Sequence, residues 1–460
     1  MRGPVHTVPA NAVTFIADRT FVDAHGTRTS QQQIFDTVMA MIDGAQDYIL
    51  IDMFLFNDFL GTQTQSYRAL SAELTAHLIA QQRAHPDMTI IFITDPINTV
   101  YGGARSPFLE RLTRAGVQVI ITDLTRLRDS NPAYSAFWRT FVQWWGNSTQ
   151  GGHLPHLMDA RAGRITLRSY LAALNFKANH RKVIVADYTR ADGTRGMHTL
   201  ITSANPHDGS SAHSNVALKV DELLWRDVVA SERAVARFSG ADFAEPEMID
   251  DRVREEVRAD GDTVRVQLLT EGAIKEALIK NITTLTAGDT LDMMMFYLAD
   301  RDVMHALTEA LARGVQMRVI LDPNKDAFGR KKNGVPNRQV AAQLHAHPSG
   351  HARVRWCDTH GEQCHSKMVI MRRATGETAL LLGSANLTRR NIGDYNMETD
   401  VLVRSRRPVA CMRDAQQFFD EQWHNDGARR YTRAYEAYKD ERIGMRLLYR
   451  IMEATGMSSF

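Results

Sequence analysis

Two histidine–lysine pairs are the residues of this chain best suited to chemistry. His180 and Lys182 lie in the run NHRKVIVAD, and His365 and Lys367 lie in CHSKMVIMR. Each pair opens an apolar stretch typical of a buried strand. Two residues apart on a strand, an imidazole and an ammonium group point to the same face. Because imidazole titrates near neutrality, each pair would offer a nucleophile or an acid beside a cation.

Both pairs are followed by the same polar residues. A Ser-Ala-Asn run comes after each apolar stretch, and another asparagine stands ten residues beyond it. One His-x-Lys pair carries little information, but two copies followed by the same residues at the same spacing are very unlikely to arise by chance. The shared set is Ser203, Asn205 and Asn215 in the first half, and Ser384, Asn386 and Asn396 in the second.

The elements that must position these pairs also occur twice. Residues 32–56 and 273–298 each show an amphipathic helix pattern that leads into a strand-like apolar run. A second such unit follows at 70–96 and at 303–323, and both end in Asp-Pro. Helices that alternate with buried strands, twice over, predict two α/β lobes with largely parallel central sheets. Chance likeness between generic helix–strand units is the alternative on this pattern alone.

Composition excludes several classes of protein. The chain has 460 residues, of which 44% are hydrophobic, and its net charge is +2. The chain can therefore bury a large core. Its positive and negative charges are too evenly balanced for a protein that binds duplex DNA mainly by neutralising phosphates. Its three cysteines (Cys357, Cys364 and Cys411) exclude a disulfide scaffold and permit a reducing compartment.

No targeting or membrane-spanning segment is evident. Apolar runs fall short of the roughly 20 residues that cross a bilayer, and the first residues lack the regions of a signal peptide. We therefore expect a soluble or peripheral membrane protein in the cytoplasm. A periplasmic or secreted chain whose targeting segment had been removed would look the same.

The doubled arrangement resembles the phospholipase D superfamily, the HKD phosphodiesterases, over essentially the whole chain. His180, Lys182 and Asp187 match the family motif in full. The resemblance implies two pseudo-twofold-related α/β/α lobes, one active site at their interface, and no metal or other cofactor. One histidine would attack phosphorus, the other would protonate the leaving oxygen, and lysines and asparagines would hold the phosphate. Phosphodiester cleavage needs these groups: a nucleophile, an acid and fixed donors.

The two halves differ in ways that assign roles. Arg372 stands where the second motif should have its aspartate, and Glu398 stands where the first half has Ala217. In relatives this acidic residue bonds the opposite histidine, so Glu398 would orient His180, while Asp208 could replace the carboxylate that His365 lacks. A carboxylate stabilises an imidazolium-like phosphohistidine. We therefore expect His180 to be the nucleophile and His365 the general acid.

The expected site is thus large. The catalytic residues would be His180, Lys182, Asp187, His365, Lys367 and Glu398, and the phosphate-binding residues would be Ser203, Asn205, Asn215, Ser384, Asn386 and Asn396. The alternative is a degenerate member of the family that has lost catalysis. The chain retains both histidines, both lysines and both asparagines of the Ser-Ala-Asn runs, which argues against this alternative. A zinc site at Cys357, His360, Cys364 and His365 is disfavoured, because zinc would disable His365.

The patterns also divide the chain. We expect a first lobe at 1–245, a linker at 246–262, a second lobe at 263–425 and a basic amphipathic tail at 426–460. The interval from Asp95 to His180 is about twice that from Asp322 to His365, which places an aromatic insertion at about 125–175 in the first lobe.

The insertion and the tail favour a lipid substrate. Aromatic side chains of the insertion suit a membrane interface or a lid over an acyl groove, and an ordinary buried helix is the alternative. The tail, with seven basic residues, suits an anionic bilayer, or else packs its apolar side on the second lobe. The loop 330–332 (RKK), near the site mouth, fits a lipid headgroup or a nucleic-acid backbone equally well.

The sequence therefore predicts a phospholipid phosphodiesterase or phosphatidyltransferase of the cardiolipin synthase type, acting on a membrane surface. The alternative is a nuclease or a tyrosyl-DNA phosphodiesterase-like enzyme, since that branch also lacks the second aspartate. No basic stripe favours this alternative. A third interpretation is a membrane-binding scaffold that keeps the site only by descent. The sequence indicates neither the oligomeric state nor the preferred lipid headgroup.

Overall fold

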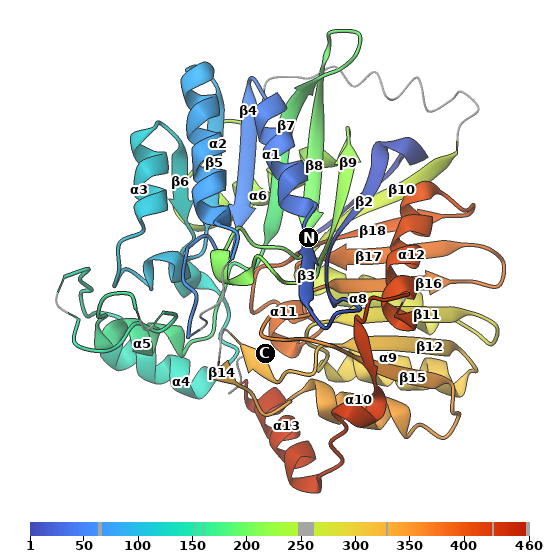
Figure 1. The fold of residues 1–460 in the computed structure, drawn as a ribbon. Coiled ribbons are helices and arrows are strands. Elements are labelled where there is room, and N and C mark those ends of the chain that lie inside the picture. Colours follow the sequence, from blue (N-terminus) through green and yellow to red (C-terminus); the bar gives the residue numbers. More distant parts are fainter. Residues whose placement is uncertain are drawn as a thin grey trace.

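The computed structural model describes residues 1–62, 67–150, 152–159, 161–246, 262–327, 330–425 and 427–456. Two large sheets, each covered by helices, form its framework (Figure 1). The first sheet has the strand order β3 (Arg28–Gln31), β2 (Val13–Val22), β9 (Asn215–Asp221), β8 (Arg195–Thr202), β7 (Lys182–Thr189), β4 (Tyr48–Met53), β5 (Thr89–Thr94) and β6 (Gln118–Ile121). The second has the order β1 (Arg2–Pro9), β10 (Thr263–Thr270), β18 (Thr399–Ser405), β17 (Thr378–Gly383), β16 (Lys367–Arg372), β11 (Thr290–Met295), β12 (Gln316–Leu321), β15 (Ala352–Cys357) and β19 (Thr432–Ala434).

Helices occupy the intervals between these strands. In the first half they are α1 (Ile34–Gly44), α2 (Leu70–Ala84), α3 (Pro107–Arg114), α4 (Pro132–Phe137), the π-helical turn η4 (Trp138–Val142), α5 (Leu167–Ala173) and α6 (Leu224–Phe238). In the second they are α8 (Gly272–Thr283), α9 (Arg301–Ala312), α10 (Asn337–His345), α11 (Arg389–Ile392), α12 (Ala410–His424) and α13 (Ile443–Thr455). A short hairpin joins β13 (Asp326–Ala327) to β14 (Arg330–Lys331).

The two sheets confirm the internal repeat and the α/β fold class. The order β2-β9-β8-β7-β4-β5-β6 in the first recurs in the second as β10-β18-β17-β16-β11-β12-β15. The expectation of largely parallel sheets is wrong, because only β4–β5–β6 and β11–β12–β15 run parallel. Helical connections join these parallel strands, whereas short turns join β7 to β8 and β16 to β17, and a short turn forces antiparallel pairing.

The chain ends depart from the expected division of the sequence. β1 opens the chain, yet it pairs with β10 in the second sheet. The expected linker 246–262 lies outside the described residues except for its two end positions. In the expected tail, an α-helix begins only at Ile443; before it, β19 extends the second sheet, and Arg430 and Arg433 form ion pairs with Asp358.

Apolar faces explain how the layers hold together. On α1, Ile34, Val38 and Ile42 recur every four residues, and all three are fully buried against the first sheet. A matching core lies under α8, α9 and α10. A further core includes side chains from both sheets, for example Val216 and Val401. Burial of this shared apolar surface fixes one lobe against the other and so fixes the interface between them.

Candidate active site

The two histidines lie where the lobes meet. β7 and β16 begin at Lys182 and Lys367, so each histidine precedes its strand instead of forming part of it. The backbone N–H of His180 donates to the Met397 carbonyl at 2.9 Å, and that of His365 donates to the Ser214 carbonyl, also at 2.9 Å. Each histidine is therefore tied to the opposite lobe.

The two Asp-Pro runs support the segments that carry the histidines. Asp95 accepts a hydrogen bond from the backbone N–H of Asn179 at 2.7 Å, and Asp322 accepts one from Cys364 at 2.9 Å. These are the residues directly before His180 and His365. The sequence shows the aspartates only as strand ends, although their recurrence in both halves could have marked them as part of the site.

Each imidazole is oriented through Nδ1, but by a different group. His180 Nδ1 lies 2.9 Å from the Glu398 carboxylate, whereas His365 Nδ1 lies 3.2 Å from Oδ1 of Asn215. Both partners sit in the lobe that holds the other histidine's strand. Because the partners take Nδ1, the Nε2 atom of each ring is left for the cavity that both histidines line.

The sheet register shows that Asn215 and Glu398 occupy equivalent positions. Each directly precedes a residue whose backbone N–H bonds the Ser-Ala-Asn hydroxyl, at 3.0 Å and 2.9 Å respectively. The connecting loop is longer in the second half. The sequence alignment, which matches Asn215 with Asn396 and Ala217 with Glu398, is therefore out of register. His365 has a partner at the matching place, and it is an amide.

Three other expected residues do not reach the cavity. The hydroxyls of Ser203 and Ser384 are buried and bond the residues that orient the histidines, so they do not hold phosphate. Asp208 accepts hydrogen bonds from the N–H and hydroxyl of Ser71, at 2.9 Å and 2.8 Å. It therefore does not replace a carboxylate beside His365, since its oxygens are engaged at the start of α2.

Asp187 is also absent from the site, contrary to its expected catalytic role. It lies within β7, towards the end remote from His180, where its carboxylate accepts backbone N–H bonds from residues 46–48 at 2.9–3.2 Å. Arg195 adds an ion pair at 3.1 Å. In the second half Asp289 serves the same corner from the neighbouring strand, accepting N–H bonds from Thr286 and Ala374. Arg372 can therefore replace the motif aspartate without loss to the site.

The lysines form a symmetrical pair beneath the histidines. Lys182 Nζ donates to the His180 carbonyl and Lys367 Nζ to the His365 carbonyl, both at 2.6 Å. The two ammonium groups lie over the rings of Phe54 and Phe296, each 5.2 Å from the ring centroid. Both lysines are buried, so water screens little of any charge that they carry.

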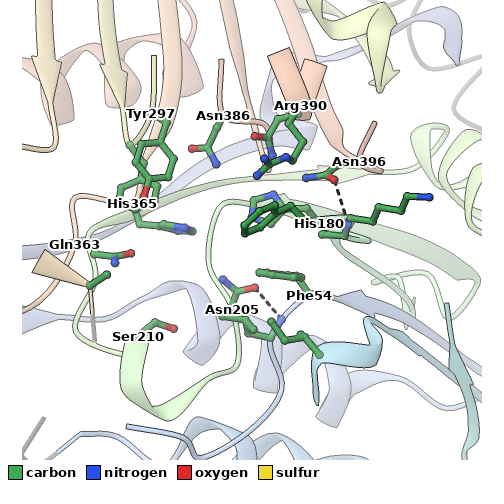
Figure 2. Close-up of a pocket in the computed structure, with 18 of the residues that line it drawn as sticks. Phe54, His180, Asn205, Ser210, Tyr297, Gln363, His365, Asn386, Arg390 and Asn396 are labelled. Carbon is green, nitrogen blue, oxygen red and sulfur yellow. Dashed lines mark hydrogen bonds between the residues drawn. The ribbon is translucent and has the colours of Figure 1, made fainter. Parts of the chain in front are cut away.

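A cavity of about 370 Å³ joins these groups. His180, His365 and three of the expected asparagines line it: Asn205, Asn386 and Asn396. In Figure 2 the imidazole of His365 points towards that of His180 across the cavity. Asn205 also accepts the Leu55 N–H at 3.2 Å, and Asn396 accepts the Ala178 N–H at 3.1 Å. These bonds fix the amides at the cavity wall.

Comparison with known proteins agrees with this geometry. Residues 278–423 match a family model described as "Cardiolipin synthase, PLD-like domain". Phosphatidylserine synthase of Haemophilus influenzae superposes with a TM-score of 0.58 at 11% identity, over 98% of this chain and 94% of that one. Residues 278–423 therefore resemble a phospholipase D-like domain, and the chain as a whole shares its fold with a phosphatidylserine synthase.

Other comparisons are more distant. Polyphosphate kinase of Porphyromonas gingivalis gives a TM-score of 0.47 at 14% identity, over 96% of this chain and 52% of that one. Nuc of Salmonella typhimurium gives 0.28 at 20% identity, over 37% of this chain and 99% of that one. A search of curated proteins found no match.

Burial has a strong influence on the pKa values of the ionisable groups at this site. Burial and the two nearby lysines hold the pKa of His180 and of His365 well below the usual value. Burial lowers the pKa of Lys182 to about 7 and raises that of Glu398 to about 7. A bound phosphodiester anion would favour the charged lysines and a protonated histidine, because opposite charge stabilises both.

Several cavity residues were not expected from the motifs. Tyr297 and Lys332 line it, the latter from the loop at 330–332 that the sequence places at the site mouth. Arg390, at α11, and the imidazole of His213 also line it. The ring of His213 lies 5.7 Å from that of His365. None of these residues belongs to the His-x-Lys or Ser-Ala-Asn runs, and only Lys332, through its basic loop, was marked by the sequence.

Two of the three cysteines are joined in the structure. Cys357 and Cys364 form a disulfide, a pairing that the odd cysteine count does not predict. Two of the four residues of the alternative zinc site are thus joined, and the described residues hold no group of three or more side chains suited to a metal ion. Within the same residues, no helix is long and apolar enough to span a bilayer.

Proposed function

We propose that this protein is a phospholipid phosphodiesterase or phosphatidyltransferase that acts through a covalent phosphohistidine at His180. The observation that carries the proposal is the unequal pair of imidazoles at one cavity, His180 on a carboxylate and His365 on an amide. Glu398 stabilises positive charge on His180, which suits a phosphoimidazolium. Asn215 fixes the His365 ring without opposing loss of its proton, which suits an acid.

The reaction proceeds in two balanced steps. His180 Nε2 attacks phosphorus and the bond from phosphorus to the alcohol oxygen breaks, while His365 Nε2–H gives its proton to that oxygen. Lys182, Lys367 and the cavity asparagines stabilise the phosphoryl oxygens. In the second step His365 takes a proton from water or from a second alcohol. The oxygen so activated attacks phosphorus and the phosphorus–nitrogen bond breaks, which restores His180.

Two findings support a phospholipid substrate. The matching family and the most similar fold reported above are named for the synthesis of phospholipids. In addition, aromatic residues of the insertion are exposed, among them Trp144 at 76%, and the end of the same insertion lines the cavity at Ala173. Water as acceptor gives phosphatidic acid, and a glycerol-type hydroxyl gives headgroup exchange of the cardiolipin synthase type.

Product analysis on phosphatidylglycerol vesicles tests this function. Wild type and His180→Ala are compared with and without added glycerol and a chelator. We expect phosphatidic acid or cardiolipin from the wild type alone, with no effect of the chelator. The ratio of the two products separates hydrolase from transferase. Cleavage of single-stranded DNA or of a 3′-tyrosyl adduct, with no lipid turnover, would contradict the proposal and assign a nucleic-acid phosphodiesterase.

A further inference from the structure

Large apolar side chains are exposed in two segments of this protein far more than elsewhere. Of the thirteen exposed large hydrophobic residues in the described part of the chain, ten lie between 137 and 174 or between 443 and 451. These ten residues, here called the docking surface, are Phe137, Phe141, Trp144, Trp145, Leu167, Leu174, Ile443, Leu447, Leu448 and Ile451. Such a concentration marks an interaction site, since single exposed apolar residues are normally scattered.

The α13 part of the docking surface is the outer face of an anchored helix. Ile443, Leu447 and Ile451 recur every four residues and are 81%, 59% and 50% exposed. The opposite face is fixed: the Tyr449 hydroxyl donates to the Ala299 carbonyl at 2.8 Å. Met445 and Met452 also pack on the cluster that contains the cavity residues Phe296 and Tyr297. The helix therefore packs behind the cavity residues Phe296 and Tyr297, and its apolar outer face is left uncovered.

The two segments lie next to each other at the cavity. Arg390, which lines the cavity, donates to the carbonyl of Gly456 just after α13, at 3.0 Å. Its neighbour Arg389 donates to the Ser130 carbonyl just before α4, at 3.3 Å. On the other side Ala173 and Phe176, at and just after the end of α5, line the cavity beside exposed Leu174. Figure 1 shows α4, α5 and α13 along the same lower edge of the molecule.

The charge of these segments selects one kind of partner. Residues 125–175 contain six arginines and two aspartates, whereas the whole chain carries only +2. Both aspartates are engaged: Asp129 pairs with Arg139 and Lys177, and Asp159 pairs with Arg161. Arg126 and Arg128 pair with Asp123 and Asp394, at 3.5 Å and 3.8 Å, but the side chains of both arginines stay exposed, at 57% and 65%. On α13 the acidic residue Glu453 is buried and pairs with Arg301. Exposed arginines beside tryptophan and aliphatic side chains match an anionic lipid surface.

We infer that the docking surface inserts into the headgroup region of an anionic phospholipid bilayer and holds the cavity mouth against it. The inference rests on the proposed function in naming a lipid as the occupant. Insertion at two places, one on each lobe, also fixes the orientation of the site. A phospholipid would then reach His180 with its phosphate while its acyl chains stay in or near the bilayer.

Sedimentation with vesicles tests the docking surface directly. Phe141→Ser with Trp144→Ser removes one part, Leu447→Ser with Ile451→Ser removes the other, and Val5→Ser with Ile121→Ser is the matched control at exposed apolar positions elsewhere. On phosphatidylglycerol–phosphatidylcholine vesicles we expect each docking pair to weaken binding about tenfold or more. The control should bind as wild type does, and all proteins should bind pure phosphatidylcholine less well. Circular dichroism and the unfolding temperature verify that each variant is folded.

Turnover separates this inference from the proposed function. The docking variants should lose activity on vesicles but keep activity on dispersed short-chain phosphatidylglycerol. Unchanged vesicle binding by both docking pairs would overturn the inference. A wild type that is dimeric in sedimentation velocity, with monomeric docking variants, would overturn it too and assign the surface to a second copy. Vesicle binding that needs this surface, with no lipid turnover by the wild type, would retain the docking surface and refute the function.

Discussion

The two half-sites share one scaffold and differ in a single orienting group. Both have a buried lysine under the histidine, a supporting aspartate from an Asp-Pro run and a backbone bond to the other lobe. Glu398 faces His180, whereas Asn215 faces His365. Since burial and both lysines act on each imidazole, the difference between carboxylate and amide is what separates their roles in the proposed mechanism. Roles in a symmetrical fold can thus be set by one residue.

Removing the two histidines should have the largest effect and should separate their roles. With an ordinary alcohol leaving group, His180→Ala abolishes turnover and His365→Ala slows it by about 10²–10⁴-fold. A p-nitrophenyl phosphodiester needs no protonation of its leaving group. His365→Ala should therefore still release one equivalent of nitrophenol in a burst and accumulate the phosphohistidine. Rapid quench and mass spectrometry detect both, and a burst from His180→Ala with phosphate on His365 would reverse the assignment.

Glu398→Gln should have the next largest effect, and it should change the pH profile. The neutral amide cannot stabilise a phosphoimidazolium, so we expect kcat to fall by roughly 10²-fold or more. In the wild type the pKa of Glu398 is raised to about 7 by burial, so the carboxylate is lost as pH falls through that value. Activity should then fall below pH 7, and this acidic limb should be missing in Glu398→Gln. An unchanged acidic limb in the variant would assign it to another group.

Asn215→Asp should have a smaller effect, of a different kind. It gives His365 the carboxylate that only His180 has, which raises the pKa of His365 because a nearby negative charge favours the protonated ring. A more basic histidine keeps its proton to higher pH and is a weaker acid. We therefore expect the basic limb of the pH–rate profile to move upwards while maximal turnover falls modestly. A profile identical to that of the wild type would show that the partner of His365 has no influence on its titration.

The sequence predicted the repeat well, and it named both histidines that the structure brings to one cavity, but it placed the supporting residues less well. The His-x-Lys pairs and Ser-Ala-Asn runs are recognisable because their spacing recurs, and the same periodic patterns located α1, β4, α8 and β11. The role of Asn215 was missed because the loop before β18 is longer than that before β9, and loop length shifts an alignment without leaving a local signal. Only strand register reveals such an offset.

Other features were missed or wrongly predicted because they depend on contacts between distant parts of the chain. The direction of a strand depends on how its connection crosses the sheet, so an apolar run alone gave the wrong parallel arrangement. Arg390, in the short helix α11, and His213, in the loop before β9, line the cavity, and neither belongs to a repeated motif. Asp187 was misassigned because the motif that contains it is catalytic as a whole, whereas its carboxylate serves the far part of the same strand.

Asp187→Ala should have the smallest effect on turnover and a clear effect on stability. The variant leaves the N–H groups at the start of β4 without their acceptor, at a position that is 1% exposed. Loss of such a buried acceptor costs about 1–3 kcal/mol in the free energy of unfolding. Asp47→Ala is the control, since Asp47 also pairs with Arg195 but is exposed, and an exposed pair contributes less than about 1 kcal/mol. A large fall in kcat at a temperature where Asp187→Ala remains folded would return this carboxylate to the catalytic machinery, whereas a lower unfolding temperature with kcat preserved would confirm that the motif aspartate acts on the fold alone.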